Sequence, residues 1–150
     1  MANIDSATLN VNRYMQCFGE SDLVTGNIAL AANPTAADVI RVMKIPAGNA
    51  VSALLIGNGA LDTNGAPTLV VSIGYAPVNA ADGPAAVANY FSAAGDGVLK
   101  SANAGKLYCN FAEITFEKDV YLTMTVGTAS ATFAAASVYA IAMAKARGVK

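Results

Sequence analysis

The 150-residue chain is rich in hydrophobic residues (55%), poor in charged ones (13%), and carries a formal net charge of −1. Ordinary soluble domains carry about 25% charged residues, so this chain has more apolar surface than one small core buries. The length fits a single domain over residues 1–150, and the scattered lysines and arginines form no basic stripe for nucleic acid.

The surplus apolar surface indicates that the chain either spans a membrane or buries this surface against other protein chains. A spanning helix needs about 18 consecutive apolar residues, and polar residues interrupt every such stretch here. The best stretch, 133–144, is too short and runs into Lys145 and Arg147. MANIDSATLNVNR lacks the basic start and apolar run of a signal peptide. We therefore expect a chain made in the cytoplasm that works as an oligomer or on a large partner.

The first 20 residues contain the aromatic segment NVNRYMQCFG, with Tyr14, Met15 and Phe18. Aromatic residues and methionine are favoured at the cores of protein interfaces. Residues 1–20 are thus either a first strand in the core or an arm that reaches a neighbouring subunit.

Alternation of period two is the clearest pattern in the chain, as in VIRVMKI, where Val39, Arg41, Met43 and Ile45 share one face. Together with β-branched residues and flanking turn residues, it predicts a series of strands. In chain order these strands cover 22–30, 39–45, 51–56, 68–75, 110–117 and 120–126.

The glycine-rich stretch at 51–75 poses a choice between a phosphate-binding loop and a bend between strands. Gly57 and Gly59 begin a GxGxxG pattern, but Asp62 stands where the third glycine belongs, and no helix follows to receive a phosphate. We predict a bend at 58–59 and a turn at Asn64-Gly65, a dipeptide typical of hairpins.

Residues 76–106 form a long Ala/Gly-rich loop without clear strands. Pro84 is placed to start a short helix through 89–91, which Gly95 and Gly97 would end. Long connections inside a domain are usually functional or mobile. Tyr90 and Phe91 in this loop are either core residues or interface residues.

The alanine-rich segment near the C-terminus fits either a helix or a strand. Alanine favours helix, but Tyr139, Ile141, Met143 and Lys145 alternate with alanines, and only a strand collects them on one face. We predict a strand. Many short strands with one long excursion indicate an all-β protein, a β-sandwich or a barrel.

No motif for catalysis stands out, and we expect no enzyme, no cofactor and no metal. The chain lacks histidine, which removes the Ser-His-Asp and Cys-His arrangements and the usual zinc sites. Glu113, Glu117 and Asp119 are the closest acidic set, best explained as solvated strand edges and turns. Cys17 and Cys109 are expected to be reduced and mostly buried, with a disulfide between them left open.

Two parts of the chain resemble a group of small bacteriophage virion proteins, the head decoration or capsid cement proteins. The segment DLVTGNIALAANPTAADVIRVMKIPAGNAVSALLIGNGALDTNGAPTLVVSIGY resembles the group's strand, "IPAG" turn and strand series. VYLTMTVGTASATFAAASVYAIAMA resembles its closing pair of strands. The similarity covers roughly residues 22–75 and 119–144.

The resemblance implies a jelly-roll-like antiparallel β-sandwich on the outside of an icosahedral phage head. Such proteins clamp subunits of the major capsid protein as dimers or trimers, and no catalytic residue is carried across. Tyr14, Met15, Phe18, Tyr90 and Phe91 are the candidate interface residues. Alternatives are a head-fibre or tail component, or a glycan-binding module on the virion surface.

Overall fold

A computed structural model of the chain describes residues 1–6, 21–93 and 105–148. Within these residues the chain forms strands and no helix. The strands are β1 (Asn3–Asp5), β2 (Ser21–Leu30), β3 (Val39–Ile45), β4 (Asn49–Asn58), β5 (Val70–Pro77), β6 (Val87–Ser92), β7 (Gly105–Cys109), β8 (Ile114–Phe116), β9 (Val120–Thr128) and β10 (Ala136–Ala146).

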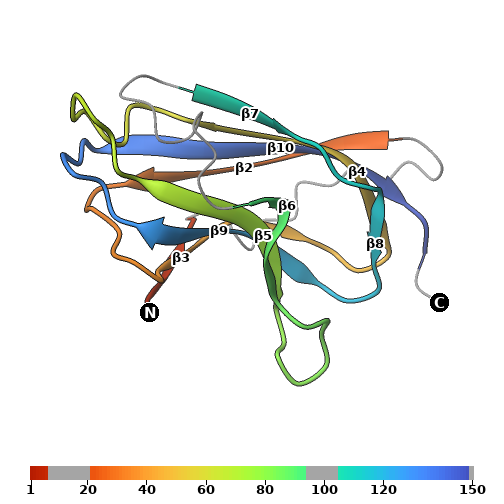
Figure 1. The fold of residues 1–150 in the computed structure, drawn as a ribbon. Helices are drawn as coiled ribbons and strands as arrows, with labels where there is room; N and C mark the ends of the chain where they lie inside the picture. Colours follow the sequence, from red (N-terminus) through yellow and green to blue (C-terminus); the bar gives the residue numbers. More distant parts are fainter. Residues whose placement is uncertain (7–20, 94–104, 149–150) are drawn as a thin grey trace.

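The strands form two sheets that stack as layers, a jelly-roll-like β-sandwich (Figure 1). One sheet has the order β1-β3-β9-β5-β6, and the other has the order β2-β10-β4-β7, with β8 pairing the far end of β4. Successive strands from β2 to β5 alternate between the sheets. Neighbouring strands run antiparallel except for β1 and β3. The expected all-β sandwich is confirmed.

The core lies between the sheets and follows the predicted alternation in part. The predicted common face of Val39, Arg41, Met43 and Ile45 is wrong, because the register shifts between Arg41 and Met43. Ile40 and Val42 are therefore buried before the shift, and Met43 and Ile45 are buried after it.

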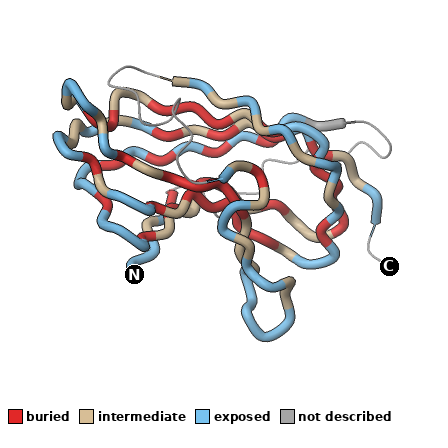
Figure 2. Tube along the Cα trace, viewed as in Figure 1, coloured by how far each residue is buried: buried red, intermediate tan, exposed pale blue. Residues whose placement is uncertain are grey.

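In β9, Val120, Leu122, Met124 and Val126 are buried on the predicted inner face, and Tyr121 and Thr123 of the other face are buried too. Figure 2 shows buried residues alternating with more exposed ones along strands of the β2-β10-β4-β7 layer, whereas β5 and β9 of the other layer carry runs of buried residues. Between β2 and β3 the layers come very close: a Cβ at Gly26 would lie 2.5 Å from the Val42 carbonyl oxygen.

Most predicted strands are confirmed with small shifts at their ends, including the C-terminal strand β10. The predicted strand 110–117 is shorter in the structure, since only Ile114–Phe116 pairs as β8. The short helix predicted through 89–91 is wrong. This segment is part of strand β6, in which Val87 pairs with Tyr75 and Ser92 with Ile73. Aromatic and β-branched residues favour this pairing over a single helical turn.

The chain bends at 64–66, where a turn was predicted, but this bend does not form a hairpin. The predicted bend at 58–59 is wrong, since Asn58 still belongs to β4 and the first bend lies at residue 61. β4 and β5 belong to different sheets, so residues 59–69 cross from one layer to the other. The Asn64 side chain turns the chain locally by accepting the Ala66 N–H at 2.9 Å. The glycines of this stretch therefore serve a bend between layers, and no helix follows them.

Candidate interaction surface

The outer side of the β2-β10-β4-β7 sheet carries an unusual band of apolar side chains. In β10 the residues that face the core are Val138, Ala140, Ala142 and Ala144, each at most 2% exposed. The larger side chains alternate with them and face outward. The usual arrangement, with large residues inside and small or polar ones outside, is thus inverted in this strand.

Strand register extends this band across the whole sheet. Ile141 lies beside Leu55 of β4, which lies beside Tyr108 of β7. One step further along β10, Met143 lies between Leu23 of β2 and an alanine of β4. We call the outward side of this sheet the β10 face, with its apolar band made by Leu23, Ala53, Leu55, Tyr108, Tyr139, Ile141 and Met143.

The β10 face holds most of the large hydrophobic side chains that the described residues expose. Tyr108 is 76% exposed, Leu23 is 66% exposed and Met143 is 41% exposed. The others in this class are Met1 at the chain end and Val78, which follows β5. Large exposed apolar patches on a folded domain are typical of interaction sites.

One end of the β10 face is hollowed around Tyr139. The Tyr139 ring occupies the space above Gly57, where a Cβ would lie 2.2 Å from the ring carbon Cζ. A depression of about 300 Å³ adjoins the ring, lined by Asn58, Gly59, Gly105, Lys106, Ser137 and Tyr139. Glycine at 57 therefore lets an aromatic ring lie flat across two strands.

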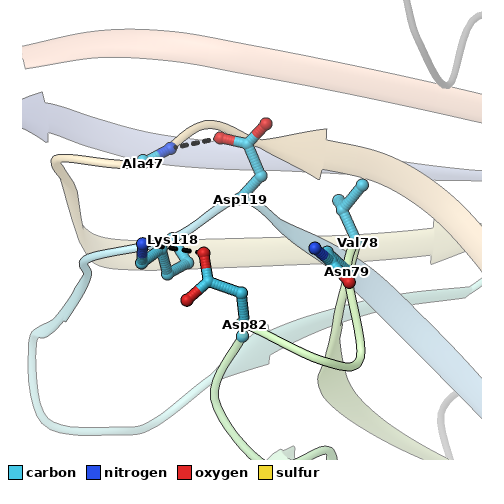
Figure 3. A pocket seen from close by; sticks show the side chains of 7 residues that line it. Ala47, Val78, Asn79, Asp82, Lys118 and Asp119 are labelled. Atoms are coloured by element: carbon cyan, nitrogen blue, oxygen red, sulfur yellow. Dashed lines mark hydrogen bonds and ion pairs between the residues drawn. The ribbon is translucent and has the colours of Figure 1, made fainter.

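The loop between β5 and β6 projects from the other layer, away from the β10 face (Figure 1). At its base a pocket of about 240 Å³ is lined by residues of this loop, of the turn after β3 and of the corner before β9. Figure 3 shows two contacts in this pocket, one from Lys118 to Asp82 and one from Ala47 to Asp119. The Lys118 Nζ lies 2.9 Å from Asp82 Oδ2, and the Ala47 N–H donates to Asp119 Oδ1 at 2.8 Å.

The carboxylates of this pocket are engaged in structural contacts. Burial on its own would raise the pKa of Asp119, but Lys44, 2.6 Å away, and the Ala47 N–H hold that pKa below its ordinary value. The hydrogen bond and charge of Asp82 raise the pKa of Lys118. Asp119 and Lys118 therefore stay ionised near neutral pH, and the contact of Lys118 with Asp82 fastens the loop, so the two shifted groups are poorly suited to acid–base chemistry there.

A fully buried carboxylate, Asp62, lies where the chain crosses between the layers. Its oxygens accept backbone N–H groups from both crossing segments, those of Asn64, Thr68, Leu69, Ala131 and Thr132, at 2.8 to 3.3 Å. Burial alone would raise the pKa of Asp62, but these N–H groups outweigh it and hold the pKa far below the ordinary value. Asp62 therefore joins two loops from inside the protein.

The remaining acidic candidates do not form a catalytic pair with Asp119. Glu113 and Glu117 line a separate depression of about 330 Å³ beside Arg147. An Arg147 nitrogen donates to Glu113 Oε1 at 2.6 Å, while Asp119 lies in the pocket beneath the β5–β6 loop. Among the described residues, no cluster of three acidic or cysteine side chains has the geometry of a metal site.

The predicted interface residues fall into two groups. Tyr14, Met15 and Phe18 lie outside the described residues, as does Cys17. Tyr90 and Phe91 come together in an aromatic cluster with Tyr75, Phe111 and Phe116, in edge-to-face contacts with centroids 4.7 to 6.4 Å apart. Phe91 is 3% exposed, whereas Tyr90 is half-buried at the surface of the cluster. An interface role for these residues stays a prediction.

The β10 face was not predicted as a site, although its signal is present in the sequence. The alternation of Tyr139, Ile141 and Met143 with alanines identifies two faces of one strand. Both faces are apolar, so periodicity alone does not show which of them faces the core.

The described residues contain no helix long and apolar enough to cross a membrane.

Comparison with known proteins finds similarity in structure and not in sequence. No protein-family model matches the chain, and no curated protein matches it. A chain in the solved capsid of Ralstonia phage GP4 is similar with a TM-score of 0.75 and 20% identity, over 99% of both chains. A chain in the capsid asymmetric unit of cyanophage Pam1 is similar with a TM-score of 0.66 and 20% identity, over 92% of this chain and 96% of that one. The two-layer fold is thus one that chains of two solved phage capsids share.

Proposed function

We propose that the chain is a structural protein of a bacteriophage virion, which binds the outside of the icosahedral capsid and bridges subunits of the major capsid protein. The observation that carries the proposal is the match, over 99% of both chains, with a chain in the solved capsid of Ralstonia phage GP4. The resemblance of residues 22–75 and 119–144 to head decoration proteins supports the same role.

The physical properties of the chain suit a protein that acts by attachment. Two five-stranded sheets packed on one core make a stiff body, and the surplus of apolar surface favours contacts with other chains. We infer that the chain is made in the host cytoplasm and attaches as a dimer or trimer, with no enzymatic activity. Many copies on one shell make weak single contacts effective through multivalency.

Stabilisation of the shell then follows from mass action. A protein that binds the assembled shell and not its dissociated subunits lowers the free energy of the assembled state. Bridging contacts between neighbouring subunits would add resistance to the pressure of packaged DNA. No chemical step is needed, which agrees with carboxylates that serve structural contacts.

Density-gradient separation of a lysate of the phage that encodes the chain tests this function. Peptide mass spectrometry of each fraction would count this chain against the major capsid protein. We expect it to migrate with filled heads at a high, fixed copy ratio. A few copies per particle would instead indicate a vertex, fibre or tail component. Recovery only among unassembled proteins would refute a virion role.

A further inference from the structure

The β10 face differs from the rest of the described surface in its charges as well as in its apolar band. Four described cations form ion pairs, Arg41 with Asp5, Lys44 with Asp119, Lys118 with Asp82 and Arg147 with Glu113. Within the same part of the chain, Lys106 and Lys145 form none. Both belong to the outward register of the β10 face.

The position of the two lysines follows from the strand pairing. Lys106 pairs with Gly57 in the row of Tyr139, and Lys145 lies two residues beyond Met143 on the same side of β10. The apolar band thus lies between two cations. The other outward residues of this face include Thr25, Asn27, Ala29 and Ser137, and Thr115 of β8 lies in the row of Lys145. The carboxylates nearest to the face are those of Glu113 and Glu117, which line the depression beside Thr115, and Glu113 is paired with Arg147.

We propose that the β10 face is the surface by which the chain attaches to the capsid shell, at a shell site with an apolar centre and carboxylates at its rim. The inference rests on the proposed function and assigns its contact surface. The apolar centre would cover Leu23, Met143 and Tyr108, and the carboxylates would pair with Lys106 and Lys145. The projecting β5–β6 loop on the other layer then points away from the shell (Figure 1).

Charge complementarity favours a shell site over a second copy of this chain. The same face of a second copy would bring two more lysines and, among the described side chains near it, one carboxylate outside the ion pairs named above, that of Glu117. An isologous contact repeats the same residues on both sides, so it supplies at most one of the two missing partners of each copy. A different surface with acidic groups supplies them, and charged groups at a rim also fix the register of docking.

The size of the face is adequate for such a contact. Strand β10 has 11 residues, which span about 35 Å, and four strands cover about 15 to 19 Å across. The resulting footprint of roughly 600 Å² approaches the 800 Å² or so that each partner contributes to a standard interface. Shell contacts of this size, repeated over many copies, need only modest affinity each.

Zero-length carbodiimide cross-linking of the chain bound to filled heads tests the contact directly, because this reagent joins a lysine only to a carboxylate that touches it. We expect cross-links from Lys106 and Lys145 to Asp or Glu residues of the major capsid protein. The intrachain pair Lys118–Asp82, 2.9 Å apart, is an internal positive control. Cross-links to the shell from Lys44 and Lys118, with none from the β10 face, would overturn the inference.

A binding comparison on heads that lack the chain gives an independent test. The double variant Leu23→Ser/Tyr108→Ser removes two exposed apolar anchors, and we expect it to bind filled heads about tenfold more weakly or worse. Val78→Ser is the matched control, since it removes an exposed apolar side chain from the other layer. Circular dichroism melts verify the fold, and Lys106→Glu/Lys145→Glu replaces any variant that fails to fold.

The outcomes separate this inference from the proposed function. If the native chain binds no heads, the proposed function itself fails. If the native chain binds and the variants of the β10 face bind equally well, the function stands and the inference is wrong. If sedimentation shows self-association that only those variants lose, while they still bind heads, a second copy covers the face and the inference is again wrong.

Discussion

The buried carboxylate of Asp62 provides the sharpest test of how the two layers are joined. The variant Asp62→Asn keeps the size and shape of the side chain while it replaces one oxygen by an NH₂ group. Asp62 Oδ1 accepts the N–H groups of Asn64 and Thr132, and Oδ2 accepts those of Thr68, Leu69 and Ala131. An asparagine keeps an acceptor on one side only, so at least two backbone donors would face an NH₂ group.

The cost follows from the number of donors left without an acceptor. Each buried donor without an acceptor costs about 1 to 3 kcal/mol, so two of them lower the free energy of unfolding by about 2 to 6 kcal/mol. For a chain of this length about 2 to 4 °C of Tm is lost per kcal/mol, which predicts a drop of about 10 °C. Differential scanning calorimetry at neutral pH measures it.

A matched control separates the buried network from loss of charge alone. Asp82→Asn also removes one negative charge, but Asp82 is exposed and contacts Lys118 at the surface. We expect it to change Tm little, because exposed ion pairs contribute little to stability. Equal Tm values for native chain and Asp62→Asn would refute the role given to Asp62.

The same network predicts acid sensitivity. The folded-state pKa of Asp62 is depressed, so its contribution to stability is complete above the unfolded pKa of about 4 and falls as the pH drops below that value. Unfolding in urea, measured from about pH 6 to about pH 3, should show this loss for the native chain. In Asp62→Asn the pH dependence should be distinctly weaker. A pH slope that the substitution leaves unchanged would assign the acid sensitivity to other carboxylates.

Three further substitutions and one control, Gly65→Ala, test the packing of the fold by thermal unfolding. Ala37 has φ of 71°, in the left-handed region, so Ala37→Gly should raise stability by about 1 kcal/mol; a lower Tm would contradict this strain. Gly26→Ala places a Cβ 2.5 Å from the Val42 carbonyl oxygen and should cost about 1 to 3 kcal/mol, whereas Gly65→Ala, in open space, should cost less. Phe91→Ala should cost about 3 to 5 kcal/mol if Phe91 is a core residue of its aromatic cluster; a loss below about 1 kcal/mol would show that the cluster is loosely packed.

Local patterns in the sequence were sufficient for most strands and for the two-layer architecture. The alternation in 39–45 and 120–126 was sufficient to predict the two strands. It did not predict the inner face of 39–45, because the shift of register between Arg41 and Met43 places residues of both predicted faces in the core. β10 was also recognised as a strand, since only a strand separates Tyr139 and Ile141 from the alanines between them. The alternation of a strand is contained within about ten consecutive residues, so it can be recognised without knowledge of the fold.

Features that depend on distant residues were not predictable in the same way. In the sequence, Asp62 is notable only because it occupies the position of the third glycine in a GxGxxG motif. Its structural role is not predictable from the sequence, because two of its hydrogen-bond partners, Ala131 and Thr132, lie about 70 residues further along the chain. The sequence around 89–91 predicts a helix, because nothing within the segment identifies its pairing partner β5, which lies across a loop. The β10 face was missed because both sides of β10 are apolar, and only the position of the second layer decides which side is outside.

Attachment to the outside of assembled heads is the central claim, and it can be measured in one experiment. Purified chain is added to closed, filled heads produced without it, and the bound amount is counted against the major capsid protein. A protein added after assembly reaches only the exterior of a closed shell. We predict saturable binding at a fixed ratio that equals the ratio in native particles. No binding, or binding that rises without saturation, would contradict an exterior decoration role.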